Sequence, residues 1–127
     1  MKIIRNNYIP FQGFRAINLF GILFVRGNAK IDNVSLNHEE IHTAQMKEML
    51  YIFFYIGYGI EWLIRTTSYS LRYVSRKIRD KVRKWNPYLA YRRISFEREA
   101  YSNEKDLSYL DNRKRFAWIK YIKNGRN

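Results

Sequence analysis

Two histidines, His38 and His42, stand four residues apart in the stretch HEEIH, and this spacing constrains the fold more than any other feature. In an α-helix, residues four apart lie one turn above each other on the same face, so two imidazoles at this spacing can bind one metal ion. The chain has no cysteine, which excludes a disulfide framework and any cysteine-ligated metal site. The sequence therefore favours a helix across HEEIH, with a metal site built from His, Asp or Glu.

The composition is that of a folded chain with an uneven charge. The 127 residues suit one domain with a modest core. The hydrophobic content of 46% and the aromatic content of 17% exclude a disordered chain, although the net charge is +13. Residues 1–64 hold six Lys and Arg against five Asp and Glu, whereas residues 65–127 hold 18 against six. We therefore expect the second half of the chain to present a basic surface.

The hydrophobic pattern predicts a predominantly helical α+β domain with a small N-terminal antiparallel sheet or hairpin. Residues 1–30 should form the strands, because Ile17–Val25 is rich in strand-forming residues and ends at a turn signal. Gly21 is a candidate position for a bulge in that strand. The apolar residues of Tyr8–Phe14 are the expected antiparallel partner. This sheet should pack on the helix that carries HEEIH.

Four helices are expected after the strands. The helix with HEEIH should cover residues 35–56, with its N-terminus capped by Asp32 or Ser35. A break is expected at Gly57 and Gly59, since glycine destabilises a helix interior. The remaining expected helices cover residues 60–84, with a basic end, residues 95–111, capped by Ser95, and residues 116–122.

Glu39 is the candidate general base. On a helix its carboxylate projects beside the two histidines and can reach a water held by the metal. A zinc ion lowers the pKa of such a water towards ~7, and the carboxylate can take its proton as the water attacks a carbonyl group. The motif therefore indicates zinc-dependent hydrolysis of a peptide bond.

A catalytic zinc needs three protein ligands, and the chain has no third histidine. Glu61 follows His42 at a spacing that occurs in one group of zinc aminopeptidases. Geometry argues against it, because a helix reaching Ile56 would carry the chain too far from the metal for a short return. We expect Glu61 to pair with Arg65 one helical turn later instead.

Glu97 is the better candidate for the third ligand. It lies in the opening turn of the helix expected over residues 95–111, which can return beside the first helix. Ala100, one turn later, would let the two helices approach closely. Glu99 is a rival from the same turn, but it projects in a nearly opposite direction, so only one of the two can face the metal. A solvent-exposed helix start, where acidic residues are favoured, is the plain alternative for both.

The segments NHEEIHTAQ and ISFEREAYSNEKD resemble a family of small bacterial proteins of the gluzincin type, which are zinc metallopeptidases. The resemblance implies a minimal zincin-like domain, Zn²⁺ as cofactor and a peptide or protein substrate. It also implies roles for five residues: ligands His38, His42 and Glu97, general base Glu39, and Gln45 as a neighbour of the site. The chain departs from the pattern at Tyr101, where these proteins usually have an Asp that orients a ligand histidine.

Two other functions fit the sequence. The first is a zinc-binding scaffold without catalytic turnover. The second is binding to a nucleic acid or an anionic membrane surface through residues 72–93, where basic and aromatic residues alternate. The apolar stretch Met49–Ile60 is too short to span a bilayer, so we expect no integral span. The expected location is the cytoplasm, with peripheral membrane attachment as an option.

Overall fold

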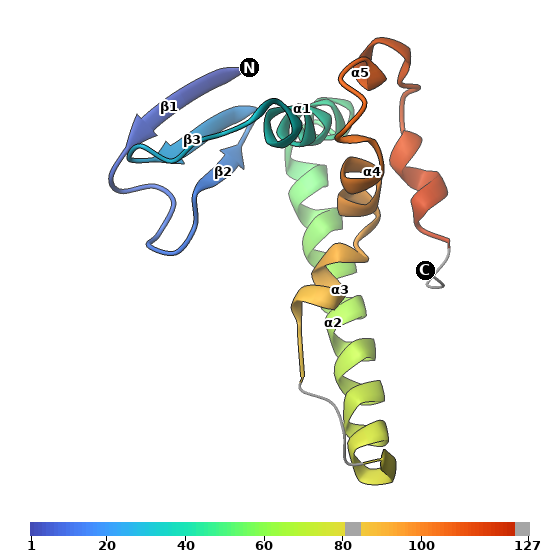
Figure 1. Cartoon of the computed structure of the whole chain (residues 1–127). Coiled ribbons are helices and arrows are strands. Elements are labelled where there is room, and N and C mark those ends of the chain that lie inside the picture. The colour runs from blue at the N-terminus through green and yellow to red at the C-terminus, as the bar shows by residue number, and fades with distance from the viewer. Residues whose placement is uncertain (81–84, 124–127) are drawn as a thin grey trace.

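The structure, a computed structural model, forms an L in which a small sheet extends sideways from a column of helices (Figure 1). It describes residues 1–80 and 85–123, with side chains to residue 75 and from residue 85. The elements in chain order are β1 (Lys2–Asn6), β2 (Ala16–Leu19), β3 (Ile22–Arg26), α1 (Asn33–Glu48), α2 (Ile52–Asp80), α3 (Tyr88–Arg92), α4 (Ser95–Asn103), α5 (Tyr109–Asn112) and the 3₁₀ helix η1 (Ala117–Tyr121). The expected α+β class with predominant helix is confirmed.

The sheet is mixed, with strand order β1-β3-β2. β2 and β3 are antiparallel and joined by a two-residue turn at Phe20–Gly21, where both residues have positive φ and glycine is favoured. Ile17–Val25 is therefore two strands, and Gly21 sits in their turn, not in a bulge. The prediction that Tyr8–Phe14 forms an antiparallel strand is wrong. This segment is a loop that contains a cis Ile9–Pro10 bond, and the third strand is β1, which pairs with β3 in parallel.

Helix α1 starts where the sequence predicts and ends earlier. The Asp32 side chain accepts a hydrogen bond from the Ser35 N–H at 2.7 Å, which is a typical N-cap. The helix ends at Glu48, because Leu50 and Tyr51 take left-handed backbone conformations that turn the chain. Tyr51 packs against the core, and this burial offsets the cost of its backbone conformation. The expected helix over residues 35–56 is therefore wrong at its C-terminal end.

Helix α2 runs unbroken through both glycines at which we expected a break. A Cβ atom at Gly57 would make ordinary van der Waals contacts with Met49 and Phe96, at 3.6 and 3.7 Å, so α4 packs closely on α2 at this position. A glycine costs a helix interior only about 1 kcal/mol, which this packing offsets. The expected basic end at 76–84 falls outside the residues whose side chains are described. Within the described residues, no helix is both long and apolar enough to cross a membrane.

Helix α4 is capped by a residue from another helix. Its N-cap residue is Ile94, which gives no side-chain cap, so the expected cap by the Ser95 hydroxyl is wrong. Glu61 of α2 accepts hydrogen bonds from the Ser95 N–H at 2.8 Å and from its hydroxyl at 2.6 Å. An acidic side chain at this end satisfies free N–H groups and favours the helix dipole. Glu61 thus fixes the start of α4 on α2.

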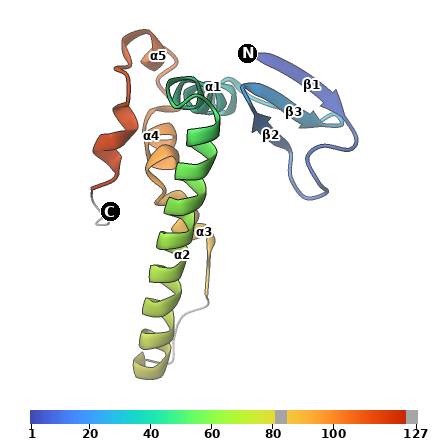
Figure 2. The ribbon, with the colours of Figure 1, turned by 180° about the vertical axis from the view of Figure 1, so that it is seen from behind.

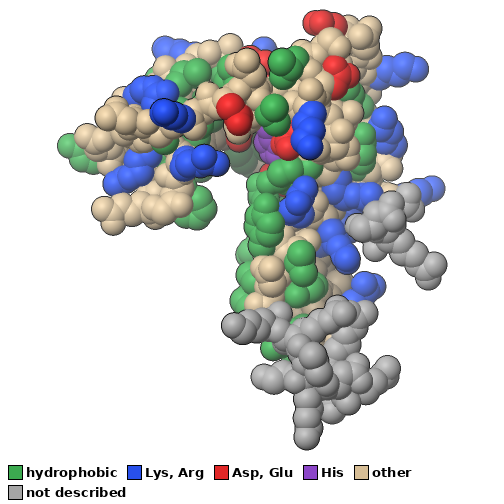
Figure 3. Space-filling model, in the orientation of Figure 1, with side chains coloured by type: hydrophobic (Ala, Val, Ile, Leu, Met, Phe, Trp, Pro, Cys, Tyr) green, Lys and Arg blue, Asp and Glu red, His purple; other side chains and the backbone are tan. Residues whose placement is uncertain are grey.

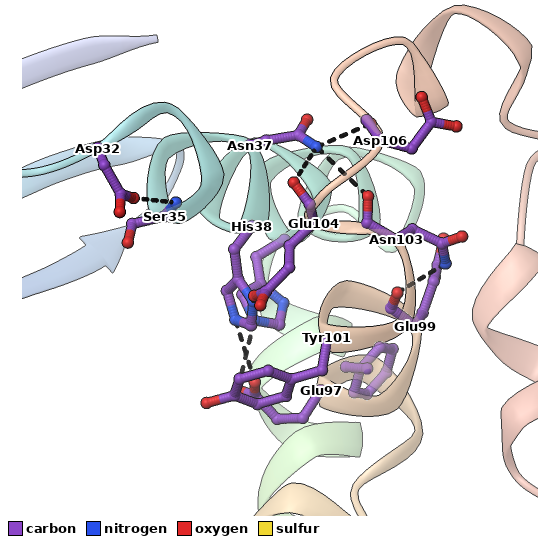
Figure 4. Close-up of polar contacts among 12 residues, drawn as sticks. Asp32, Ser35, Asn37, His38, Glu97, Glu99, Tyr101, Asn103, Glu104 and Asp106 are labelled. Atoms are coloured by element: carbon purple, nitrogen blue, oxygen red, sulfur yellow. Dashed lines mark hydrogen bonds and ion pairs between the residues drawn. The ribbon is translucent and has the colours of Figure 1, made fainter.

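Asn37 of α1 ends α4. Its side-chain amide donates to the carbonyls of Asn103 at 3.4 Å, Glu104 at 2.8 Å and Asp106 at 3.0 Å (Figure 4). The Asn37 amide thus supplies hydrogen-bond partners for carbonyls at the C-terminal end of α4. The chain leaves the helix axis at this point. The expected helix over 95–111 is consequently split into α4 and α5, and the expected helix over 116–122 is the shorter η1.

The core lies where α1, α2 and α4 meet. Met46, Phe54, Ile94 and Phe96 form its buried cluster. The Phe96 ring packs against Phe54 with centroids 4.8 Å apart, and Trp118 of η1 covers its other side at 4.6 Å. These contacts hold α4 against α1 and α2, and this arrangement brings the first turn of α4 beside HEEIH.

A buried ionic network closes the other side of α4. Arg113 forms two hydrogen bonds to Glu48, at 3.0 and 2.8 Å, and an ion pair with Glu99. Tyr109 also donates to Glu99, at 2.9 Å. The side chains of Arg113 and both glutamates are almost fully buried, so each charge depends on its partners for stability.

We predict that Arg113→Leu destabilises the fold by about 3–5 kcal/mol, because it leaves two buried carboxylates without their cation. Urea unfolding followed by circular dichroism measures the loss. Lys114→Leu is the matched control, since Lys114 is exposed and its substitution should change the free energy of unfolding by less than about 0.5 kcal/mol. Equal stability of the Arg113 variant and the wild type would contradict this account of the network.

Candidate metal centre

Three side chains from two helices converge at the corner of the L. His38 and His42 come from α1, and Glu97 comes from the first turn of α4. The two Nε2 atoms lie 3.1 Å apart, and the Glu97 carboxylate oxygens lie 3.3 Å from each of them (Figure 4). All three residues are buried, and their donor atoms lie within 4.8 Å of one another. This group can hold a metal ion.

The geometry of the three donors fits a small ion. Ligands ~2.0–2.2 Å from one tetrahedral ion lie ~3.3–3.5 Å apart, close to the spacings here. Among the described residues, the Glu97 Oε2 atom is buried without a hydrogen-bond donor, a costly state for a carboxylate oxygen. A cation bound between the three side chains would supply the missing partner. The donor set and the unpaired oxygen therefore both fit a metal.

The orientation of His42 follows from its contact with Gln45. The Gln45 amide nitrogen donates to the Phe96 carbonyl at 3.0 Å and to Glu99 at 2.9 Å, which uses both of its hydrogens. Its oxygen lies 2.8 Å from Nδ1 of His42 and must accept a hydrogen bond there. His42 consequently carries its proton on Nδ1, and the lone pair of Nε2 faces the other donors.

His38 is oriented by Glu104, which the sequence analysis missed. The Glu104 carboxylate lies 2.8 Å from Nδ1 of His38, and an ionised carboxylate only accepts (Figure 4). The Nε2 lone pair of His38 therefore also faces Glu97. Tyr101 lies edge-on to the His38 ring, with centroids 4.6 Å apart, but its hydroxyl contacts Tyr88. Tyr101 thus neighbours the site as expected, while Glu104 supplies the orienting carboxylate.

Electrostatics favour a positive charge among these groups. Burial lowers the pKa of His42, but the Glu97 carboxylate raises it more, so that the pKa is about 9. Burial opposes ionisation of Glu97, yet His42 and His38 hold the pKa of its carboxyl well below the usual range. The pocket thus keeps Glu97 ionised and favours a positive charge at His42, which is a proton unless a metal ion replaces it, because a metal binds the unprotonated imidazole.

Glu39 borders a cavity of about 490 Å³ that opens beside the three donors. His42 and Glu97 line the same cavity, together with apolar side chains of β2, α1 and α2. The Glu39 carboxylate is near enough to His42 to raise its pKa. Its backbone carbonyl accepts a hydrogen bond from Asn18 of β2 at 2.8 Å, which ties the sheet to α1. The general-base role of Glu39 stays a prediction.

The two rival carboxylates have other partners. Glu99 is fully buried in the Arg113 network on the opposite side of α4. Glu61 pairs with Arg65 at 2.8 Å, as predicted, and also caps α4 through Ser95. Both are therefore engaged away from the histidines.

A signal for Glu104 was present in the sequence. It follows Glu97 by seven residues, two helical turns, so both project from the same side of the chain. Tyr58, whose hydroxyl donates to Glu97 at 2.8 Å, had no comparable signal. Its position depends on α2 passing through Gly57, where we expected a break.

The basic region at 72–93 lies partly outside the described side chains. In its described part, Trp85 donates to the Ser70 hydroxyl at 3.0 Å, and Tyr88 stacks on Tyr91 with centroids 5.6 Å apart. Tyr91 is half-buried and lines the cavity beside Glu97. Arg92 lies 4.0 Å from the ring centroid of Tyr101. Tyr91 of this region therefore borders the candidate site, and Tyr88 contacts its neighbour Tyr101.

No protein-family model, curated protein or solved structure matches this chain. The account of the site rests on its own residues and their geometry, and the resemblance to gluzincin-type proteins stays a prediction.

We predict that the wild type binds close to one equivalent of Zn²⁺ and that Glu97→Ala weakens this binding at least tenfold, because one of three donors is lost. Isothermal titration calorimetry measures the affinity. Asp111→Ala is the control, since Asp111 is an exposed carboxylate outside the site. If both variants bound zinc as the wild type does, the assignment of Glu97 would be wrong.

We also predict that Glu104→Gln lowers zinc affinity about 10–100-fold, because the amide no longer favours the Nδ1–H form of His38 as strongly as a carboxylate. Competition with a chromogenic chelator measures the affinity. Asp111→Asn, which makes the same kind of change at an exposed position, should bind zinc as tightly as the wild type. An unchanged affinity in the Glu104 variant would contradict its orienting role.

Proposed function

We propose that this chain is a zinc-dependent metallopeptidase of the gluzincin type, with Glu39 as general base. The observation that carries the proposal is the buried triangle of His38, His42 and Glu97, two of whose members, His42 and Glu97, line a cavity together with Glu39. A structural metal site is closed by four protein ligands, whereas a catalytic site has three and faces a substrate cavity. Within the described residues, three candidate ligands converge here, and two of them, His42 and Glu97, border a cavity.

Zinc is the metal that best suits these donors. Two imidazole nitrogens and one carboxylate oxygen form a donor set that zinc hydrolases use. Bound at this position, zinc would supply Lewis-acid activation of a water and of a substrate carbonyl. Glu97 and the two histidines contribute by holding their donors in place before the ion binds, since Gln45, Glu104 and Tyr58 fix their orientations.

Glu39 would move the proton. It is the glutamate directly after His38, and it lines the cavity together with His42 and Glu97. From there it can accept a proton from the attacking water and donate it to the leaving amine. Glu97 is engaged with both histidines and with Tyr58, which leaves Glu39 as the carboxylate on this wall for that role.

Tyr91 is our candidate for stabilising the oxyanion of the transition state. It lines the cavity beside Glu97 and Tyr58. Burial and the Glu97 carboxylate raise the pKa of Tyr91, whose hydroxyl interacts with Glu97 and would turn to the substrate to donate there. A donor aimed at developing negative charge is worth several kcal/mol in such a site.

Strand β2 offers a place for an extended peptide. It is at the edge of the sheet, and its residues Ala16–Leu19 line the cavity. An edge strand has free backbone groups that can pair with a substrate backbone. The cavity wall is mostly apolar, with Phe11, Phe14 and Phe54 among its residues, which favours apolar substrate side chains.

The decisive experiment compares wild type, Glu39→Gln and His42→Ala on a mixture of synthetic peptides with apolar residues, with cleavage followed by mass spectrometry. We predict zinc-dependent cleavage by the wild type and a loss of at least 100-fold in Glu39→Gln, which should still bind zinc. His42→Ala should lose both zinc and activity. The magnitude follows from removing a general base.

Two outcomes would contradict the proposal. Cleavage that persists in Glu39→Gln would point to a contaminating peptidase. Stoichiometric zinc without cleavage of any peptide in the mixture would favour the scaffold function, in which the same three residues hold zinc for structural reasons.

A further inference from the structure

The outward face of α2 is apolar along the whole described part of the helix. With successive residues turned by about 100°, its exposed apolar side chains fall within one arc of about 120°. Each of them is more than half exposed: Ile52, Phe53, Ile56, Ile60, Leu63, Ile64, Leu71 and Val74. We refer to these eight residues as the α2 apolar face. No charged residue lies in this arc between residues 52 and 75.

The opposite, inward side of α2 is more polar than its outward side. It contributes Phe54 to the core, but also Tyr58, which binds Glu97, and the ion pair of Glu61 with Arg65. In a helix at the surface of a soluble protein the apolar side faces inward and the polar side faces water. In α2 most of the apolar side chains face outward instead. This outward face is therefore suited to contact with an apolar partner.

Ile60 and Ile64, at one border of the face, line a cavity of about 570 Å³ together with Trp118 and Ile122, whereas no described residue is recorded in contact with the rest of the face. Helices α3 and α4 run along one side of α2 only, and the side away from them is open in both ribbon views (Figures 1 and 2). Figure 3 shows apolar side chains along one edge of the α2 column, below the sheet. An apolar surface of this length is far larger than the scattered exposed residues of an ordinary domain.

The net charge of the chain favours an anionic partner for the α2 apolar face. The chain carries 24 Lys and Arg against 11 Asp and Glu, a net charge of +13. Basic side chains are distributed over the sheet and beside α2 (Figure 3). An anionic lipid surface attracts such a chain by about 1 kcal/mol for each basic residue near it. Two copies of the same chain would repel each other instead.

The pattern of α2 also suits a bilayer better than a second helix. A two-helix seam would follow positions 53, 56, 60, 63, 67, 70 and 74, and the polar residues Thr67 and Ser70 lie in this seam as well as in the full arc. Such a seam would leave Ile52, Ile64 and Leu71 outside it, whereas a lipid surface covers the full arc.

We propose that the chain docks on anionic membrane surfaces through the α2 apolar face, with α2 lying in the plane of the interface. The helix inserts its apolar side chains among the lipid acyl chains, and the basic residues contact the headgroups. The docking does not depend on the metal or on catalysis, so it stands apart from the proposed peptidase activity.

The test is co-sedimentation with phosphatidylcholine vesicles that contain phosphatidylserine, compared with vesicles of phosphatidylcholine alone. The wild type should bind the anionic vesicles, and binding should weaken with salt. Leu63→Gln should reduce the partition coefficient about tenfold, because a leucine side chain is withdrawn from lipid. Leu107→Gln is the matched control: Leu63 is 59% and Leu107 60% exposed, but Leu107 lies between α4 and α5. The control should bind as the wild type does.

Three results would overturn the proposal. The first is no binding of the wild type to anionic vesicles at low salt. The second is equal binding of Leu63→Gln and the wild type, which would assign membrane binding to the basic residues alone. The third is a stable dimer by analytical ultracentrifugation that Leu63→Gln dissociates, which would assign the face to a second copy. Both variants are exposed substitutions, and their circular dichroism spectra and zinc content check that they fold.

Discussion

Three electron-pair donors facing one another in a buried pocket are the constraint on which the rest of this structure depends. The Nε2 atoms of His38 and His42 and the Glu97 carboxylate lie 3.1–3.3 Å apart, and this cluster needs a positive charge, carried by a proton on His42 or by a metal ion. The chain maintains this arrangement by fixing the opposite end of each side chain. Gln45 and Glu104 hold the Nδ1 atoms of the histidines, and Tyr58 holds one oxygen of Glu97.

Several sets of contacts hold α4 in its position beside α1. Glu61 fixes the start of α4, Asn37 fixes its end, and the Arg113 network stabilises its side away from the site. Through Gln45, that network also reaches His42, because Glu99 accepts one hydrogen of the Gln45 amide. A buried ion pair thus contributes to the orientation of a metal-site histidine. Stability of the fold and geometry of the site depend on the same side chains.

Sequence patterns predicted local features well and long-range contacts poorly. The helix with HEEIH, its Asp32 cap, the N-terminal strands and the Glu61–Arg65 pair follow from residues close together in the chain. The turn at Leu50 and Tyr51 has no such signal, because neither residue type favours the left-handed conformation that packing imposes. The caps of α4 come from α1 and α2, and the role of Glu104 depends on a turn that Asn37 creates.

An anomalous-scattering crystal structure of the zinc-loaded protein tests the central claim most directly. We predict one zinc peak about 2.0–2.2 Å from the Nε2 atoms of His38 and His42 and from a Glu97 oxygen. The peak should border the cavity that Glu39 lines. A peak bound by other residues, or no peak between these three side chains at saturating zinc, would contradict the account.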